Sequence, residues 1–218
     1  MTIKLNGSTA GSVALDAPAS TTGNADISFK LPVADGSAGQ VIKTDGSGNL
    51  AFVAQPASGL TEADMFILTS NLSVNATATT VTSNLARSGY SFAGANAKVG
   101  TGMSQSSGVF TFPSTGIYLI TTVASFKSNN QTLYAAFRTQ FSVDSGSNYY
   151  YTAVNYTNIF DSGSNDVWTS ATGQSIVDVT NTSTDRLRFS ATSNANVTLV
   201  GHANEAYTSM VFLRLGDT

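Results

Sequence analysis

The sequence contains no cysteine and a single histidine, His202. The absence of cysteine excludes disulfides, thiol catalysis and cysteine-based zinc sites. One histidine cannot supply a multi-histidine metal site within one chain. No run of about 18 apolar residues occurs, so we expect no membrane insertion. Residues 1–7 lack the apolar core of a signal peptide, which predicts synthesis in the cytoplasm of the producing cell.

Charge is also scarce. Charged residues make up 11% of the chain, against roughly 25% in an average soluble domain. The net charge of −3 offers no basic excess for phosphate groups, so nucleic acid is not an expected partner. Lysine and glutamate, which normally cover exposed helix faces, are rare, whereas serine, threonine and asparagine form about a third of the chain. This composition predicts strands and tight turns, and hence an all-β fold.

The apolar pattern divides the chain in two. Residues 1–58 contain short apolar pieces with period-two alternation, separated by turns rich in glycine and serine. We interpret them as an extended, β-rich N-terminal arm that cannot form a core alone, and residues 54–60 as a linker. Residues 62–218 form the second expected domain, where many strand patterns follow one another as in a sandwich or barrel. The expected strands are 65–74, 77–84, 97–104, 108–113, 116–127, 131–143, 149–160, 166–171, 174–181, 185–191, 196–201 and 206–215.

The sequence has no pattern typical of an enzyme site. Serine and aspartate are plentiful, but no serine lies in Gly-x-Ser-x-Gly, so nothing selects a partner for His202. Glu62 and Glu205 are the only glutamates, and most aspartates stand beside glycine, serine or asparagine, where turns explain them. No phosphate-binding loop occurs. We therefore expect a non-enzymatic protein without a cofactor or metal, and we interpret His202 as an ordinary loop or interface histidine.

One loop motif occurs twice. Asp144–Asn148 has the sequence Asp-Ser-Gly-Ser-Asn, and it recurs as Asp161–Asn165, which Asp166 follows. Both copies lie between strand patterns and are typical of hairpin loops. Cation binding is the alternative interpretation, although the spacing differs from that of a calcium loop. The sequence leaves this alternative open.

Aromatic residues cluster between residues 149 and 168. Three consecutive tyrosines begin the cluster, and alternation along a strand would place Tyr150 on one surface and Tyr149 and Tyr151 on the other. Tyrosine suits interfaces because it joins apolar area to a hydroxyl group. The cluster is either core and subunit contact or a surface for a glycan or receptor. The expected binding or trimer-interface residues are Phe137, Phe141, Tyr149, Tyr150, Tyr151, Tyr156, Trp168 and Phe212.

Residues 108–118 have the pattern Gly-x-Phe-x-x-Pro-x-x-Gly-x-Tyr, formed by Gly108, Phe110, Pro113, Gly116 and Tyr118. This pattern resembles the central motif of the complement-globular-head and tumour-necrosis-factor-like jelly rolls, where it leads one strand into the next. The end of the chain, residues 207–215, is similar to the final strand of that family, which runs through the middle of a sheet. The resemblance implies a ten-stranded jelly-roll β-sandwich over residues 62–218 that assembles as a homotrimer.

Residues 31–53 carry a second resemblance. They are typical of two short strands joined by a Lys-Thr-Asp-Gly-Ser-Gly-Asn turn. This segment is similar to one found in tailed-phage virion proteins, especially fibres of marine and cyanobacterial phages, where it lies between an attachment region and a distal domain. The resemblance implies a structural protein of a phage particle.

Together these patterns predict a trimeric tail fibre or adhesin on the surface of a virion. Residues 1–58 would contact other virion proteins, and residues 62–218 would face a host surface glycan or receptor. A capsid decoration or head-fibre protein is the first alternative, because the chain is short for a fibre that must reach a host. A secreted-type ligand or glycan-binding module is a further alternative, which the missing cysteines and signal peptide disfavour.

Overall fold

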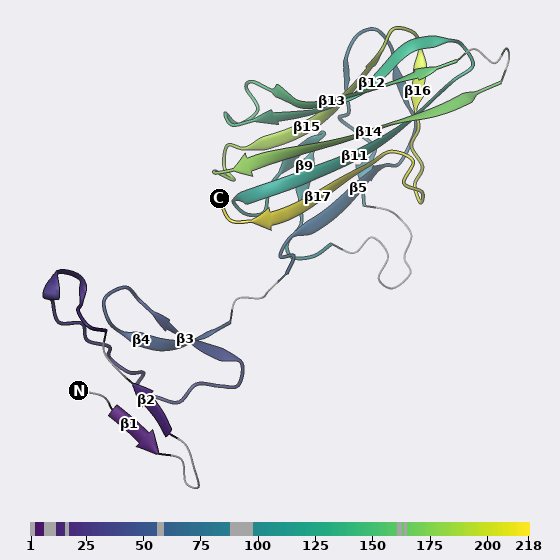
Figure 1. Ribbon diagram of the computed structural model, residues 1–218. Coiled ribbons are helices and arrows are strands. Elements are labelled where there is room, and N and C mark those ends of the chain that lie inside the picture. Colours follow the sequence, from purple (N-terminus) through teal and green to yellow (C-terminus); the bar gives the residue numbers. More distant parts are fainter. Residues whose placement is uncertain are drawn as a thin grey trace. The chain divides into compact units, whose positions relative to one another are not determined.

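The structure, a computed structural model, describes residues 3–6, 12–15, 18–55, 59–87, 98–160, 163 and 165–218. The chain divides into two compact units, Met1–Ser58 and Gly59–Thr218 (Figure 1). Strands dominate both units, and the short helix within the described residues is the 3₁₀ turn η1 (Thr22–Asn24). The all-β class expected from the composition is therefore confirmed.

The first unit contains two antiparallel hairpins. The turn of the second hairpin is closed by Asp45, whose carboxylate accepts hydrogen bonds from the Asn49 backbone N–H (3.1 Å) and side-chain amide (2.6 Å). These bonds lower the pKa of Asp45, the side-chain bond from Asn49 having the largest effect. The hairpins are β1 (Ile3–Asn6) with β2 (Ser12–Leu15), and β3 (Gln40–Thr44) with β4 (Leu50–Ala54).

The first unit has no buried core in its described part. Where the structure describes side chains between residues 18 and 55, none is buried. Phe29 and Leu31, for example, are 64% and 72% exposed. Backbone bonds hold the segment in place, since Lys30 N–H donates to Gly48 O and Leu50 N–H donates to Lys30 O, both at 2.8 Å. The unit is thus ordered by backbone pairing and turns, and its apolar side chains stay open to contact.

The second unit is a sandwich of two antiparallel sheets (Figure 1). The six-stranded sheet has the order β13-β12-β15-β10-β9, with β7 paired to β15, and the seven-stranded sheet has the order β6-β16-β11-β17-β5-β8, with β14 paired to β11. The last strand therefore runs between two others, as the resemblance implied. The six-stranded sheet comprises β7 (Thr79–Thr80), β9 (Ser104–Ser106), β10 (Val109–Thr111), β12 (Thr132–Ser142), β13 (Tyr150–Ile159) and β15 (Arg186–Ser193). The seven-stranded sheet comprises β5 (Ala63–Leu68), β6 (Leu72–Val74), β8 (Leu85–Ala86), β11 (Gly116–Ser128), β14 (Val167–Val179), β16 (Val197–Leu199) and β17 (Ser209–Gly216).

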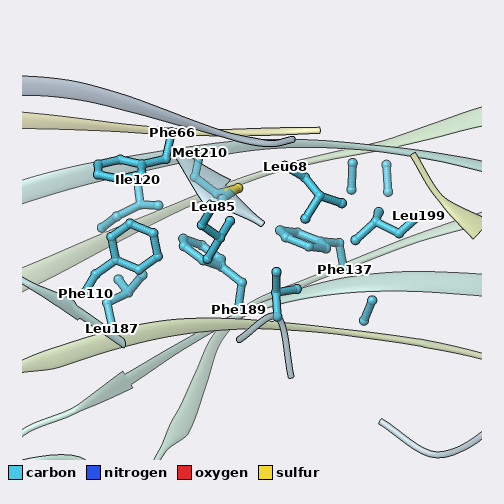
Figure 2. Packing of buried hydrophobic residues seen from close by; sticks show 14 of the residues in the cluster. Phe66, Leu68, Leu85, Phe110, Ile120, Phe137, Leu187, Phe189, Leu199 and Met210 are labelled. Carbon is cyan, nitrogen blue, oxygen red and sulfur yellow. The ribbon is translucent and has the colours of Figure 1, made fainter. Parts of the chain in front are cut away.

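Aromatic rings from both sheets fill the sandwich (Figure 2). The Phe137 and Phe189 rings stack at 5.7 Å, and the Phe110 and Phe212 rings lie 5.1 Å apart. Phe137 and Phe212 are each 1% exposed, so the expectation that they contribute to a binding or trimer surface is wrong. The physical reason is strand alternation, which points both side chains at the opposite sheet, where each buries its whole ring.

The motif of residues 108–118 forms the passage from β10 into β11. Gly108 (φ 78°) and Gly116 (φ 139°) adopt backbone conformations that favour glycine. A Cβ at Gly116 would also clash with the Gly216 carbonyl and the Arg214 side chain. Tyr118 is buried, and its hydroxyl donates to the Ser114 carbonyl at 3.0 Å, which ties the turn to the core.

Several strand predictions differ from the structure. In the pattern at 77–84, only Thr79–Thr80 (β7) is a strand. The pattern at 65–74 divides into β5 and β6, because the polar residues Thr69–Asn71 form a turn between them. The patterns at 166–171 and 174–181 are one strand, β14, in which Gly173 makes room for the Asn155 amide of β13. In the pattern at 97–104, residue 97 lies outside the described residues, and Val99 forms a single bridge to Ala63.

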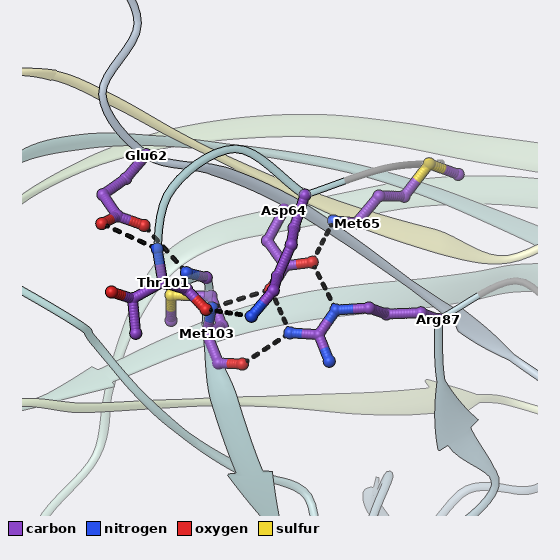
Figure 3. A network of polar contacts seen from close by, with 8 residues as sticks. Glu62, Asp64, Met65, Arg87, Thr101 and Met103 are labelled. Carbon is purple, nitrogen blue, oxygen red and sulfur yellow. Dashed lines mark hydrogen bonds and ion pairs between the residues drawn. The ribbon is translucent and has the colours of Figure 1, made fainter. Parts of the chain in front are cut away.

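A buried carboxylate anchors the start of β5 (Figure 3). Asp64 is 4% exposed and accepts hydrogen bonds from Arg87 Nε (2.9 Å) and Nη2 (2.5 Å) and from the Met103 backbone N–H (2.7 Å). Glu62 accepts from the backbone N–H groups of Thr101 (3.1 Å) and Gly102 (2.8 Å). Arg87 and the loop before β9 hold these carboxylates by hydrogen bonds, so we interpret Glu62 and Asp64 as structural.

Candidate recognition surface

The face of the six-stranded sheet that points away from the core carries arginine and tyrosine side chains. Alternation along β12 places Arg138 and Gln140 on this face, because Phe137 points into the sandwich. In the register of the sheet, Gln140 stands between Tyr151 of β13 and Arg188 of β15. We use the name Tyr/Arg face for Arg138, Gln140, Tyr149, Tyr151 and Arg188.

Each arginine of the Tyr/Arg face lies over a tyrosine ring. The guanidinium carbon of Arg188 is 3.8 Å from the Tyr149 ring centroid, and that of Arg138 is 5.2 Å from the Tyr151 centroid. Arg188 Nε donates to Gln140 Oε1 (3.1 Å), and Arg138 Nη1 donates to Tyr151 Oη (3.3 Å). These contacts hold both guanidinium groups against the sheet. Their other N–H groups have no acceptor among the described residues.

The Tyr/Arg face and its neighbour Ser190 contain buried polar atoms without a partner. Arg138 Nε, Tyr149 Oη and Ser190 Oγ have neither a hydrogen bond nor solvent contact in the described structure. Ser190 is 3% exposed and stands opposite Arg138 in the register. Burial raises the pKa of Tyr149, so its phenol is neutral at neutral pH. An unsatisfied buried group costs about 1–3 kcal/mol. The free chain thus leaves hydrogen-bonding capacity unused at this face.

The positive charge at this face is not neutralised by ion pairs. Arg138, Arg186 and Arg188 form no ion pair with any residue in the described ranges. Arg186 donates to backbone carbonyls instead, Thr182 O at 2.9 Å and Ser183 O at 2.7 Å. A chain of net charge −3 therefore presents a local cationic patch.

The Asp144–Asn148 loop beside this patch is closed by its own hydrogen bonds. The Asp144 carboxylate accepts from the Asn148 backbone N–H (2.9 Å), the Asn148 amide (2.7 Å) and the Ser142 hydroxyl (2.7 Å). These bonds, that from the Asn148 backbone first, lower the pKa of Asp144 from 3.8 to about 2. The same Asp-to-Asn closure occurs between Asp45 and Asn49. We therefore interpret the loop as a structural turn rather than a cation site.

The second copy of the loop is described only in part. Residues 161, 162 and 164 lie outside the described residues. Asp166 forms an ion pair with Lys127 at 2.9 Å. Within the described ranges, no three His, Asp or Glu side chains gather into a possible metal site.

The other aromatic residues of the expected set lie at different places. Tyr150 and Tyr156 are 69% and 63% exposed on β13, and the Tyr156 ring meets that of Tyr134 edge to face at 6.0 Å. Phe141 packs partly buried against the core, where its ring is 6.1 Å from that of Phe112. Tyr149, Tyr151 and Tyr156 thus lie on the outward face of the six-stranded sheet, whereas Phe141 lies on the face that packs against the core.

Trp168 lies on the seven-stranded sheet and is 50% exposed. Its ring contacts the Lys127 ammonium (5.5 Å to the centroid) and the Tyr207 ring (5.6 Å). Lys127 and Asp166 line a polar recess of about 430 Å³ at the end of that sheet. The other lining residues are Ser73, Val74, Asn75, Ser128, Asn129, Asn196, Val197 and Thr198.

The outward face of the seven-stranded sheet carries no charge at its centre. Three neighbouring rows of the register run across β14, β11, β17 and β5. None of their twelve positions holds a charged residue, and Ile176 is 64% exposed. We use the name uncharged sheet face for Ile176, Leu119, Leu213 and Ala63, for Gln174, Thr121, Val211 and Met65, and for Thr172 and Val123. Ser209 and Ile67, at the end of the third row, are buried.

His202 lies on an exposed turn. Its Nδ1 accepts a hydrogen bond from the Asn204 backbone N–H (3.3 Å) and is 4.0 Å from a Glu205 carboxylate oxygen. No serine hydroxyl donates to it in the described structure, so we see no nucleophile paired with this base. Among the described residues, the structure contains no helix with the length and apolarity needed to span a membrane.

Sequence reasoning missed the arginines of the Tyr/Arg face. For Arg188 the signal was present in residues 186–189, Arg-Leu-Arg-Phe. Period-two alternation there directs Leu187 and Phe189 into the core, and Arg186 and Arg188 away from it. The pairing of Arg138 with Tyr151 and of Arg188 with Tyr149 had no sequence signal, because it depends on the neighbours of β12 and β15 in the sheet.

Comparisons with known proteins identify the fold of the second unit. No family model and no curated protein sequence matches the chain. Among solved structures, Eiger TNF from S. frugiperda aligns with a TM-score of 0.54 and 12% identity over 73% of this chain and 96% of that one. Murine APRIL at pH 8.5 aligns with a TM-score of 0.47 and 13% identity over 71% of this chain and 98% of that one. The likeness to the Eiger structure, together with the two antiparallel sheets, shows a TNF-like jelly roll.

Proposed function

We propose that this chain is a non-enzymatic structural protein on the surface of a phage particle, where it forms a homotrimeric tail fibre or adhesin. Residues 1–58 attach it to other virion proteins, and the jelly roll faces a host glycan or receptor. The main support for the proposal comes from the first unit. Between residues 18 and 55, none of the side chains that the structure describes is buried. The likeness of residues 31–53 to phage virion segments supports virion proteins as the partner class.

The uncharged sheet face supports the homotrimer. A monomer would present Ile176, Leu119 and Leu213 side by side to water, with Leu215 at 56% exposure nearby. Soluble monomers rarely expose continuous apolar patches of more than a few hundred Å². Closed cyclic symmetry is the usual way to cover such a face, and the jelly-roll resemblance favours the threefold form.

The oligomeric state tests this part of the proposal. We expect sedimentation equilibrium of the full chain at micromolar concentration to give three times the chain mass of 22.5 kDa. Leu119→Asp should shift the mass to that of one chain, since it places a charge in the centre of the contact. Asn158→Asp, an exposed change on β13, should leave the trimer intact. A wild-type mass of one chain would refute the homotrimer.

The position on the particle tests the role. We expect gold-labelled antibodies against the jelly roll to mark the tails of intact particles in electron micrographs. Label spread over the capsid would contradict the fibre and support the decoration protein. Purified particles without any label would refute the virion role altogether.

A further inference from the structure

We propose that the Tyr/Arg face binds an acidic polysaccharide through the carboxylates of its uronic acid residues. The inference rests on the proposed host-recognition role for its biological setting, whereas the binding itself is a property of the purified chain. It assigns a ligand class to a surface built from Arg138, Gln140, Tyr149, Tyr151 and Arg188.

The free donors of the two arginines fit carboxylates. Arg188 uses Nε on Gln140, which leaves its two terminal nitrogens for one bidentate acceptor. Arg138 uses Nη1 on Tyr151 and its Nε is buried, which leaves Nη2 as the donor that a ligand can reach. Because the rings of Tyr149 and Tyr151 already hold these groups in place, little side-chain freedom is lost on binding.

The spacing of the surface suits an extended chain of sugars. Arg188 shares a row with Gln140, and Arg138 stands in the next row, about 7 Å along the strands at two residues per step. Tyr156 lies in the row after that, and its ring contacts that of Tyr134. Along the sheet, the guanidinium groups of Arg188 and Arg138 are thus followed by the phenol rings of Tyr156 and Tyr134. A sugar ring can place its carboxylate on an arginine and its C–H face on a neighbouring phenol.

Other acidic partners fit this surface less well. Nucleic acid carries densely spaced phosphates. The patch formed by Arg138, Arg186 and Arg188, on a chain of net charge −3, attracts them only weakly. An acidic peptide commonly adds to an open strand edge, but the two arginines stand on β12 and β15, which are paired on both sides. The arginines of the Tyr/Arg face form no ion pair with any described residue, so an acidic polymer supplies the carboxylates that these arginines lack.

The experiment measures binding of the full chain to immobilised polygalacturonate by surface plasmon resonance. We expect saturable binding, and we expect none to the same polymer after its carboxyl groups are reduced. Arg138→Gln and Arg188→Gln should each raise Kd at least about tenfold, because each removes a charge-assisted hydrogen-bond contact, which is bidentate for Arg188. Lys43→Gln, which makes the same charge change in the first unit, should change Kd by less than about twofold.

Arg188→Lys keeps the positive charge without the fork of donors, and it should weaken binding several-fold while it preserves folding. It is the second test if Arg188→Gln unfolds. Absence of wild-type binding, unchanged Kd in both glutamine variants and in Arg188→Lys, or equal binding of polyglutamate would each overturn the inference. A chain that is trimeric and present on particles but does not bind polygalacturonate would refute this inference and leave the proposed function standing. A chain that binds polygalacturonate but is absent from particles would refute the proposed function and leave this inference standing.

Discussion

At the scale of single residues, Asp64 is a buried polar anchor of the jelly roll. It is 4% exposed, and its partner Arg87 has a side chain that is 38% exposed. Asp64→Ala would leave the Met103 backbone N–H without its acceptor and Arg87 without its counter-charge. We expect a loss of about 2–4 kcal/mol in the free energy of unfolding, somewhat below that of a fully buried pair. Urea denaturation checks this.

A solvent-exposed ion pair serves as the control for Asp64. Asp166 is paired with Lys127, but its side chain is 47% exposed. Asp166→Asn should cost less than about 1 kcal/mol. Similar losses for Asp64→Ala and Asp166→Asn would show that burial does not strengthen the Asp64 network.

Asp144 predicts a pH dependence of its loop. Its folded pKa of about 2 is below the ordinary value of 3.8, so its contribution to stability is present above pH 4 and is lost as the pH falls through 2. We expect an NMR titration of the Asp144 carboxyl carbon to have its midpoint near pH 2. Asn148→Ala should move this midpoint upward, because it removes the side-chain amide donor. A midpoint at 3.8 in the wild-type chain would contradict the closed loop.

At the scale of elements, the β10–β11 turn depends on glycine for two separate reasons. Gly116 has a φ of 139°, and a Cβ there would meet the Gly216 carbonyl and the Arg214 side chain. We expect Gly116→Ala to lower the free energy of unfolding by about 1–3 kcal/mol. Gly216→Ala, at a position with open space around it, should change stability by less than about 0.5 kcal/mol. Equal effects in thermal unfolding would refute the steric argument.

Strand lengths show how neighbours override local sequence. Gly173 is typical of a strand break, yet β14 continues through it because β14 pairs with β11 along its whole length. The Asn155 amide of β13 occupies the space where a Cβ at Gly173 would lie. The break between β5 and β6, in contrast, falls at the polar residues Thr69–Asn71, which are local in the sequence. For β14 the deciding contact comes from a distant part of the chain, so the local pattern could not predict it.

At the scale of the whole molecule, the two units differ in what they can stabilise alone. Ordering one residue of backbone costs about 1–2 kcal/mol, and burying one Leu, Ile or Phe side chain returns about 1.5–3 kcal/mol. The jelly roll buries a continuous core, whereas the described side chains of residues 18–55 bury none. We therefore expect the first unit to require a partner surface that offsets the entropy cost of its own ordering.

This asymmetry predicts the behaviour of a shortened chain. A chain that begins at Gly59 should be trimeric, unfold cooperatively in urea, and fail to appear on particles that lack the native protein. Residues 1–58 alone should give no cooperative transition. Decoration of such particles by the shortened chain, or a stably folded monomer of residues 1–58, would rule out attachment through the first unit.

Composition and period-two alternation by themselves determined the all-β class of this protein, and the motif of residues 108–118 identified the jelly-roll passage, because turns and strand faces depend on neighbours in sequence. Alternation also predicts that Arg138 and Arg188 point away from the core. Only the tertiary structure decided that Phe137 and Phe212 are core, and that each arginine meets a tyrosine of an adjoining segment. The physical reason is that strand order and register bring distant residues together, and no local pattern contains that pairing.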